Sequence, residues 1–231
     1  MKTIPLINLL YCLIPLAIVW FYYKKWTNNS TEIIYATIRM VLQLLIIGYL
    51  LIYIFEQRNS IVESFILLFM ICISTLITIR NVKDKSFNTY LIIFSSILLS
   101  GLFHLILAII FVLEIELFYK PQYVIPIAGM IFANCMNVLS IGIERFEKEL
   151  SRNESFEEAR SIAFKAALIP QINSFLAVGL VSLPGMMTGQ ILSGVDPLIA
   201  VRYQIMIMAI ILSTAGITNI LYFTLKKKFS F

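Results

Sequence analysis

The sequence predicts an all-α integral membrane protein that crosses the bilayer about seven times. Hydrophobic residues make up 60% of the 231 positions and charged residues only 13%. Residues 61–79, 90–113 and 203–225 are each apolar for roughly the twenty residues that a helix needs to cross about 30 Å of hydrocarbon. Because spans and short connections use almost the whole chain, we expect a single transmembrane domain over residues 1–231.

Seven apolar stretches are expected to be the membrane-spanning helices. The first, residues 4–23, also has the position of a cleavable signal peptide. A signal peptide has a positively charged region before its apolar core, and here that region holds only Lys2. No small-x-small cleavage motif precedes Lys24, so we expect an uncleaved span. The other spans are predicted at residues 34–55, 61–79, 90–113, 123–143, 167–192 and 203–225.

The distribution of lysine and arginine predicts the orientation of the chain. Cytoplasmic loops of membrane proteins carry an excess of these residues. The odd-numbered connections, with the C-terminal tail as the last, carry thirteen basic residues, and the opposite side carries four. We therefore expect the N-terminus outside and the C-terminus in the cytoplasm of a multi-pass cell-membrane protein. The thirteen are Lys24, Lys25, Arg80, Lys83, Lys85, Arg145, Lys148, Arg152, Arg160, Lys165, Lys226, Lys227 and Lys228, and the four are Lys2, Arg58, Lys120 and Arg202.

Residues 144–165 form a charged cytoplasmic segment between the fifth and sixth spans. Ser155, followed three residues later by Glu158, is a capping-box pattern at a helix start. Pro170 is expected to end this helix, because the residue before a proline is disfavoured in the helical conformation. The pattern alone fits a solvated interfacial helix and a docking helix for a cytoplasmic partner equally well. Apolar and small residues recur there at helical spacing, at Phe156, Ala159, Ile162, Ala163 and Ala166.

The sixth span contains residues that interrupt a helix. A proline and two glycines lie at a depth where every freed backbone group needs a partner inside the protein. A discontinuous helix that lines a substrate path and a kink packed against its neighbours both fit this composition. Gly185 and Gly189 would permit a close backbone approach or an unusual backbone angle. The candidate path residues here are Pro184, Gly185, Met186, Met187, Thr188 and Gly189.

The fifth span carries small and polar residues that indicate helix contacts. Gly129 and Ala133 are four residues apart, a spacing that lets helix backbones approach closely. Asn134 and Asn137 share a neighbouring face of the same helix. A packing or dimer contact is the first interpretation of these amides, and a polar translocation path is the second.

The second span also has two polar side chains one helical turn apart. These are Arg39 and Gln43, which we interpret as helix-packing residues. Arg39 is close enough to the inner boundary for its guanidinium to extend to the interface.

No catalytic constellation can be assembled from the sequence. His104 is the single histidine, so it cannot build a metal site or a nucleophilic triad, and we expect its ring to bond a neighbouring helix. Cys12, Cys72 and Cys135 lie inside predicted spans without CxxC spacing, as small apolar residues do. Methionine thioethers are soft ligands, but methionine in a membrane chain is first a packing residue, so any metal ligands stay unknown. We expect no cofactor.

The sequence also argues against two functions, ATP hydrolysis by the chain itself and binding of nucleic acid. No GxxxxGK[ST] phosphate loop occurs, so we expect the chain itself not to hydrolyse ATP. The net charge of +5 follows from the topology, and it indicates contact with anionic membrane lipid and not nucleic acid.

Several motifs together resemble the FetB-type membrane proteins, which are permeases of ABC transporters associated with iron export and related to plant proteins of aluminium tolerance. The resemblance runs from about Arg39 to Tyr222. Its most specific part is the run GLVSLPGMMTG at residues 179–189. The other matching segments are RMVLQLLIIGY at 39–49, YIF at 53–55, IPIAGMI at 125–131, AALIP at 166–170 and YQIM at 203–206.

The resemblance implies a permease subunit that works as a homodimer with a separate cytoplasmic ABC ATPase. Residues 144–165 would then be the coupling segment, with Ser155, Phe156, Glu158, Ala159, Ile162 and Ala163 towards the ATPase. This segment departs from the family pattern in being about four residues shorter. Iron, or another metal or small solute, is the implied substrate.

A stand-alone channel or secondary transporter is the first alternative function, and a non-transporting membrane scaffold is the second. Such proteins carry acidic or basic residues well inside a span for ion or proton coupling. The candidates considered, Glu114 and Glu116, lie at the outer end of the fourth span, so this signature is weak.

Overall fold

The computed structural model describes residues 4–28, 31–57, 59–80, 82–115 and 120–229. Lys2, Arg58 and Glu116 lie outside these ranges. The described residues are nearly all helical, and one isolated β-bridge between Val178 and Ser182 is the only strand-like pairing among them. The predicted all-α, multi-pass class is confirmed. Six described helices are long and apolar enough to cross a membrane: Ile7–Thr27, Glu32–Ile52, Ser60–Ile79, Phe87–Val112, Pro121–Leu150 and Pro197–Phe229.

The chain divides into two compact units, Met1–Gln57 and Arg58–Phe231, and the expectation of one transmembrane domain stays a prediction. The first unit consists of a short 3-10 segment, η1 (Leu6–Cys12), followed by α1 (Leu13–Thr27) and α2 (Glu32–Gln57). Tyr23 near the end of α1 donates its hydroxyl to the Glu32 carboxylate at the start of α2 over 2.6 Å. On α2, Arg39 is half-buried and Gln43 is exposed, and their packing role also stays a prediction.

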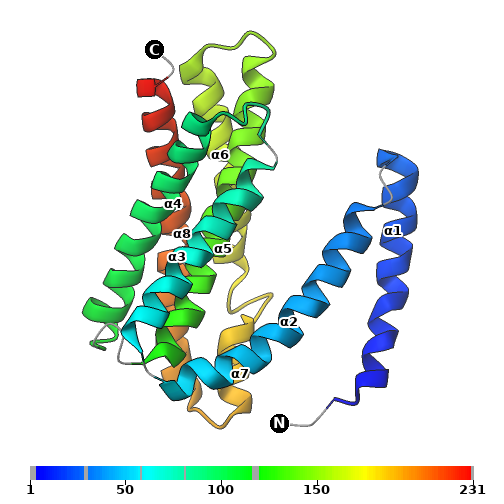
Figure 1. Ribbon diagram of the computed structural model, residues 1–231, viewed down its shortest axis with the longest axis vertical. Coiled ribbons are helices and arrows are strands. Elements are labelled where there is room, and N and C mark those ends of the chain that lie inside the picture. The colour runs from blue at the N-terminus through cyan, green and yellow to red at the C-terminus, as the bar shows by residue number, and fades with distance from the viewer. Residues whose placement is uncertain (1–3, 29–30, 58, 81, 116–119, 230–231) are drawn as a thin grey trace. The chain divides into compact units, whose positions relative to one another are not determined.

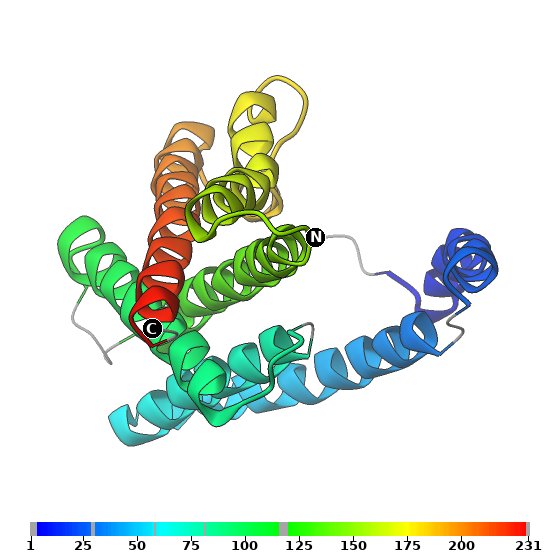
Figure 2. The ribbon, with the colours of Figure 1, turned by 90° about the horizontal axis from the view of Figure 1, so that it is seen from above.

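The second unit is a bundle built around α5. Figures 1 and 2 show α5 surrounded by α3, α4, α6 and α8, and it contacts all of these helices. The helices are α3 (Ser60–Ile79), α4 (Phe87–Ile106) continued by a π-helical segment η2 (Leu107–Val112), α5 (Pro121–Leu150), α6 (Phe156–Ala177), α7 (Gly185–Leu192) and α8 (Pro197–Phe229).

Two glycines allow the neighbouring helices to approach α5 closely. A side chain at Gly101 on α4 would meet the Phe132 ring of α5. A side chain at Gly142 on α5 would meet the amide oxygen of Asn219 on α8, which is fully buried. Both glycines therefore lie where the helix surfaces interlock, in the core that includes Ile131 and Leu139.

The predicted coupling helix and the first half of the predicted sixth span form one helix, α6. Pro170 does not end this helix, which continues to Ala177, so the predicted boundary is wrong. A proline inside a helix removes one backbone hydrogen bond and strains the preceding turn. Here Ala163 and Ala167, before the proline, are fully buried in the bundle, and this packing stabilises the helix through it.

Candidate functional site

The polar end of the second unit joins three segments that are distant in sequence. The α3–α4 loop, the end of α5 with the first turn of α6, and the end of α8 meet at this end, as Figure 1 shows. The third, fifth and last connections therefore lie on one side, as the charge pattern predicted; which side of the membrane this is stays a prediction. The contacts are Lys83 N to Glu147 Oε2 (3.1 Å), Lys226 Nζ to Asp84 Oδ2 (3.5 Å) and Lys227 Nζ to Glu157 Oε1 (2.7 Å).

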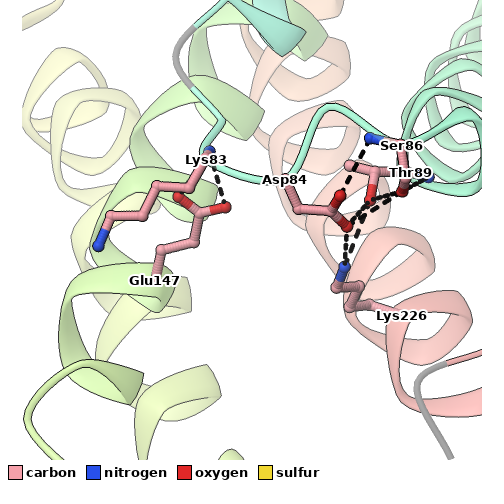
Figure 3. Close-up of polar contacts among 6 residues, drawn as sticks. All are labelled: Lys83, Asp84, Ser86, Thr89, Glu147 and Lys226. Atoms are coloured by element: carbon pink, nitrogen blue, oxygen red, sulfur yellow. Dashed lines mark hydrogen bonds and ion pairs between the residues drawn. The ribbon is translucent and has the colours of Figure 1, made fainter.

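Asp84 organises the α3–α4 loop at this end (Figure 3). Its carboxylate accepts hydrogen bonds from the Thr89 hydroxyl at 2.7 Å and from the Ser86 backbone N–H at 3.0 Å, while Lys226 of α8 lies beside it. These hydrogen bonds, chiefly that from Thr89, lower the pKa of the Asp84 carboxyl to about 2. The side chain is therefore an anion at neutral pH, and it ties the loop both to the start of α4 and to α8.

The α5–α6 connection is a tight, charged hairpin. Ser155 caps α6, because its hydroxyl oxygen accepts from the Glu158 backbone N–H at 3.3 Å. The same hydroxyl donates to the Glu158 carboxylate at 2.8 Å, which lowers the pKa of that carboxyl. At the end of α5 the buried Glu149 carboxylate binds both Arg145 (2.9 Å) and Arg152 (3.1 Å). These contacts link the end of α5 and the start of α6 to the residues of the hairpin tip.

The predicted coupling residues divide into exposed and buried ones. Ser155, Glu158 and Ile162 are exposed on the hairpin. Phe156 is half-buried, with its ring 5.2 Å from that of Phe146. The remaining two residues, Ala159 and Ala163, are fully buried in the hydrophobic core and present no surface to a partner.

The break in the sixth span lies between α6 and α7. The Ala177 carbonyl accepts from the backbone N–H groups of Leu180, Val181 and Ser182, with the Val181 bond at 2.8 Å. A cavity of about 370 Å³ separates this break from α8. Its lining includes Phe175, Pro184, Met187, Gln204, Ile205 and Met208.

The glycines that need special backbone angles are not those singled out from the sequence. Gly179 in the break has φ +82° and Gly194 after α7 has φ +91°. Gly185 and Gly189 lie in α7 without positive φ, and an added side chain at either meets nothing within 4 Å. The expectation of a close approach or an unusual angle at Gly185 and Gly189 is therefore wrong, because α7 is an ordinary helix there. Of the other candidate path residues, Pro184 caps α7 and Met186, Met187 and Thr188 are half-buried on it.

A polar link joins three helices inside the membrane. Asn134 on α5 donates its amide to the Ile211 carbonyl of α8 at 2.7 Å, and it accepts from the Gln171 amide of α6 at 2.9 Å. The structure therefore places Asn134 in an interhelical contact, whereas Asn137 is exposed. Gln171 was missed because only the fold pairs it with Asn134.

The two small residues predicted for close packing on α5 differ in their surroundings. A side chain added at Gly129 would lie 3.5 Å from Met70 of α3, so the glycine faces that helix. Ala133 is exposed.

The remaining chemistry-bearing groups are dispersed. His104 is buried with Nδ1 2.7 Å from the Ser100 carbonyl of its own helix, so the expected bond to a neighbouring helix is wrong. No group of three or more His, Cys, Asp or Glu residues that could hold a metal occurs in the described part of the chain. Glu63 on α3 is buried, and its carboxylate has no hydrogen-bond partner among the described residues. The signal for it was an acid at the start of the apolar stretch 61–79.

Sequence comparison identifies the family of this chain. Residues 6–231 match the uncharacterised protein family UPF0014. The chain belongs to this family. No solved structure matches it significantly.

Relatives in the family extend over most of the chain. The UPF0014 membrane protein slr1647 of Synechocystis is 33% identical over 84% of this chain and 80% of its own length. The probable iron export permease protein FetB of Escherichia coli is 32% identical over 89% of this chain and 84% of its own length. Protein ALUMINUM SENSITIVE 3 of Arabidopsis thaliana is 29% identical over 86% of this chain and 77% of its own length. The chain is therefore a multi-pass membrane protein of a transport-related family.

Proposed function

We propose that the chain is the permease subunit of an ABC transporter and exports iron, or another metal or small solute, with ATP hydrolysed by a separate ATPase. The observation that carries the proposal is the similarity to the Escherichia coli protein named as a probable iron export permease, which covers 89% of this chain. The absence of a phosphate loop from the sequence is consistent with an ATPase on another polypeptide.

The length of α5 supports a projecting coupling element. Its 30 residues extend about 45 Å, whereas roughly twenty residues cross the hydrocarbon. The charged end of α5 and the first turns of α6 therefore extend past the bilayer as a hairpin. A projection of this kind can transmit a movement of the ATPase to the spans, because α6 continues from it without interruption to the break.

The exposed side of this hairpin is the proposed ATPase contact. It carries Glu158 and Ile162 on α6 and Leu150 at the end of α5. An exposed leucine and isoleucine among charges offer an apolar centre with a polar rim, which is the usual composition of a protein interface. Ala159 and Ala163 support this surface from beneath by packing α6 into the core.

The broken helix is the proposed moving part of the translocation path. Backbone hydrogen bonds from Leu180, Val181 and Ser182 to the Ala177 carbonyl hold the turn together, which supports its movement as a unit. The adjacent cavity gives it space on the α8 side. Since no ligand cluster occurs in the described residues, we propose transient passage of the substrate without a resident metal site.

The proposal is tested by co-expression with a candidate ABC ATPase from the same organism. We expect the two proteins to purify as one complex from detergent and the ATPase rate to rise on association. Separate elution of a folded permease and a folded ATPase, with an unchanged rate, would contradict the proposal.

Glu63 is the observation that favours the alternative of a stand-alone channel or secondary transporter. Glu63 lies in the first turn of α3, and a buried, unpaired carboxylate in a spanning helix is the kind of group expected for ion or proton coupling. If the alternative holds, the wild type transports without an ATPase, and Glu63→Gln abolishes that transport. If the proposed function holds, the wild type transports only when the ATPase is present.

A further inference from the structure

The cavity between the break and α8 contains a buried amide with an unpaired oxygen. Gln204 on α8 lines this cavity and is only 6% exposed. Its carbonyl oxygen, Oε1, is buried and has no hydrogen-bond partner among the described residues. A buried acceptor without a partner destabilises a fold, because it has lost water and gained nothing in return. The Gln204 amide is therefore a group that a bound hydrogen-bond donor would stabilise.

The walls of the cavity come from segments that are distant in sequence. One wall belongs to the end of α6, the break and the start of α7, and the other belongs to α8. Two of the segments that carry the family resemblance, residues 179–189 and 203–206, both contribute to the lining. The volume of about 370 Å³ falls within the range of about 300–1,000 Å³ that small-molecule sites have.

The lining selects the chemistry of a ligand. Among the lining residues that the structure describes, only Gln204 has a hydrogen-bonding side chain, and none has a carboxylate, imidazole or thiol. A hydrated metal ion would therefore lose water here without gaining the oxygen ligands that hard cations need. A water molecule requires two to four polar partners, and a lipid acyl chain has no donor for the amide. The ligand that fits is a neutral small molecule with an apolar body and one hydroxyl or N–H group.

We propose that the cavity binds such a molecule, that its donor bonds the Gln204 oxygen, and that the bound molecule holds the break apart from α8. The terminal torsion of a glutamine is broad, so the oxygen can turn towards a donor in the cavity. Met187 and Met208 lie on the two walls, and their flexible thioethers adapt to an apolar body. Binding is independent of the proposed function. Its consequence, slower transport, rests on that function, because the break is the proposed moving part.

Photolabelling of the purified permease tests the site. The probe is 4-(hydroxymethyl)benzophenone, and the matched compound, 4-methylbenzophenone, has the same apolar body without the hydroxyl donor. Under near-ultraviolet light the ketone takes a hydrogen atom from a neighbouring C–H group, and the two carbon radicals join. Mass spectrometry then finds a peptide that is heavier by one whole probe. We expect adducts at Met187 or Met208, because both residues line the cavity.

Gln204→Leu removes the acceptor and keeps an apolar side chain of similar size. In the wild type we expect the hydroxyl probe to label the cavity about three- to tenfold more than the methyl compound, which corresponds to one hydrogen bond. In Gln204→Leu we expect the two compounds to label equally. The ratio within each protein cancels differences in protein amount. Without any probe, the melting temperature of Gln204→Leu should equal or exceed that of the wild type, because the unpaired group is gone.

A second pair of variants tests the location of the labelling. Ala209 lines the cavity and is exposed, so Ala209→Trp fills the space without entering the core. Ser213→Trp adds the same side chain one turn further along α8, at an exposed position outside the described lining. We expect Ala209→Trp to abolish the adducts and Ser213→Trp to retain them.

Three labelling results would overturn the inference. They are no adduct at the cavity in the wild type, the same ratio of the two compounds in the wild type and Gln204→Leu, and adducts that persist in Ala209→Trp. In vesicles kept dark, we expect the hydroxyl probe to slow ATP-driven transport by the wild type more than the methyl compound does. Equal rates with the two compounds would contradict the claim that the ligand holds the break.

The labelling and transport assays separate this inference from the proposed function, because labelling uses the permease alone. The expected labelling in a permease whose transport needs no ATPase removes only the proposed function. ATP-driven transport by a permease that is not labelled at the cavity removes only this inference.

Discussion

Gln171 on α6 donates its side-chain amide to Asn134 on α5 over 2.9 Å, while Asn134 donates in turn to the Ile211 carbonyl on α8. One asparagine thus links α5, α6 and α8. Interhelical hydrogen bonds of this kind contribute about 0.6 kcal/mol on average in membranes and up to about 1.7 kcal/mol.

Asn134→Leu should lower the stability of the second unit. We expect a loss of about 1–2 kcal/mol, because two interhelical bonds disappear and the Gln171 amide loses its acceptor. Thermal unfolding in detergent measures it. Ser213→Ala is the matched control, since that hydroxyl bonds only carbonyls of its own helix. Equal melting temperatures for Asn134→Leu and Ser213→Ala would show that the link does not stabilise the bundle.

The glycines around the break should respond in opposite ways. Gly179→Ala forces a side chain into a left-handed conformation and should cost about 1–2 kcal/mol. Gly185→Ala adds a methyl group in open space on a helix and should be neutral or stabilising by up to about 1 kcal/mol. Melting temperature and transport are measured on both variants. If Gly185→Ala keeps its stability but loses transport, α7 belongs to the path; normal transport by this stable variant would leave α7 a packing element.

The sequence predicted most of the spans but not the joints between them. Apolar length located the six helices that are long enough to cross a membrane, whereas the predicted span 167–192 is divided between the end of α6, a break and α7. Basic residues grouped Lys83, Arg152 and Lys226 at one end. Pro170 was misread because the burial of Ala163 and Ala167, which is a tertiary effect, overrides the local preference of proline.

Backbone angles and buried partners were likewise beyond the sequence. Four glycines flank or occupy α7, and nothing local separates Gly179 and Gly194, which have positive φ, from Gly185 and Gly189, which do not. The capping of α6 by Ser155 was predictable, because cap and helix are adjacent in the chain.

The Asp84 contact should make the bundle sensitive to acid. The pKa of Asp84 is lowered from 3.8 to about 2, so its contribution to stability is complete above about pH 4 and is lost as the pH falls towards 2. The side chain is more than half exposed, and the expected effect is therefore small, about 1 kcal/mol or less. Melting of wild type and Asp84→Asn at pH 6 and pH 3 measures it. We expect the difference between the two proteins to shrink at the lower pH, and a difference that grows would refute the assignment.

Neighbouring positions on α6 should separate docking from folding. Ile162→Asp places a charge on the exposed face and should abolish ATPase co-purification while the permease remains folded. Ala163→Asp buries an unpaired carboxylate in the core and should destabilise the permease itself by several kcal/mol. Gel filtration of each variant with and without the ATPase distinguishes the two effects. Retained co-purification by a folded Ile162→Asp would remove α6 from the contact.

ATP-driven transport in reconstituted vesicles tests the central claim most directly. The permease and its ATPase are reconstituted with the ATPase outside, and uptake of ferrous iron into the lumen is followed with a trapped chelating dye. We predict uptake that requires the permease, the ATPase and ATP together and that stops when the phosphate-loop lysine of the ATPase is replaced. Equal uptake by the permease alone, without ATPase or ATP, would contradict the account and identify a stand-alone transporter.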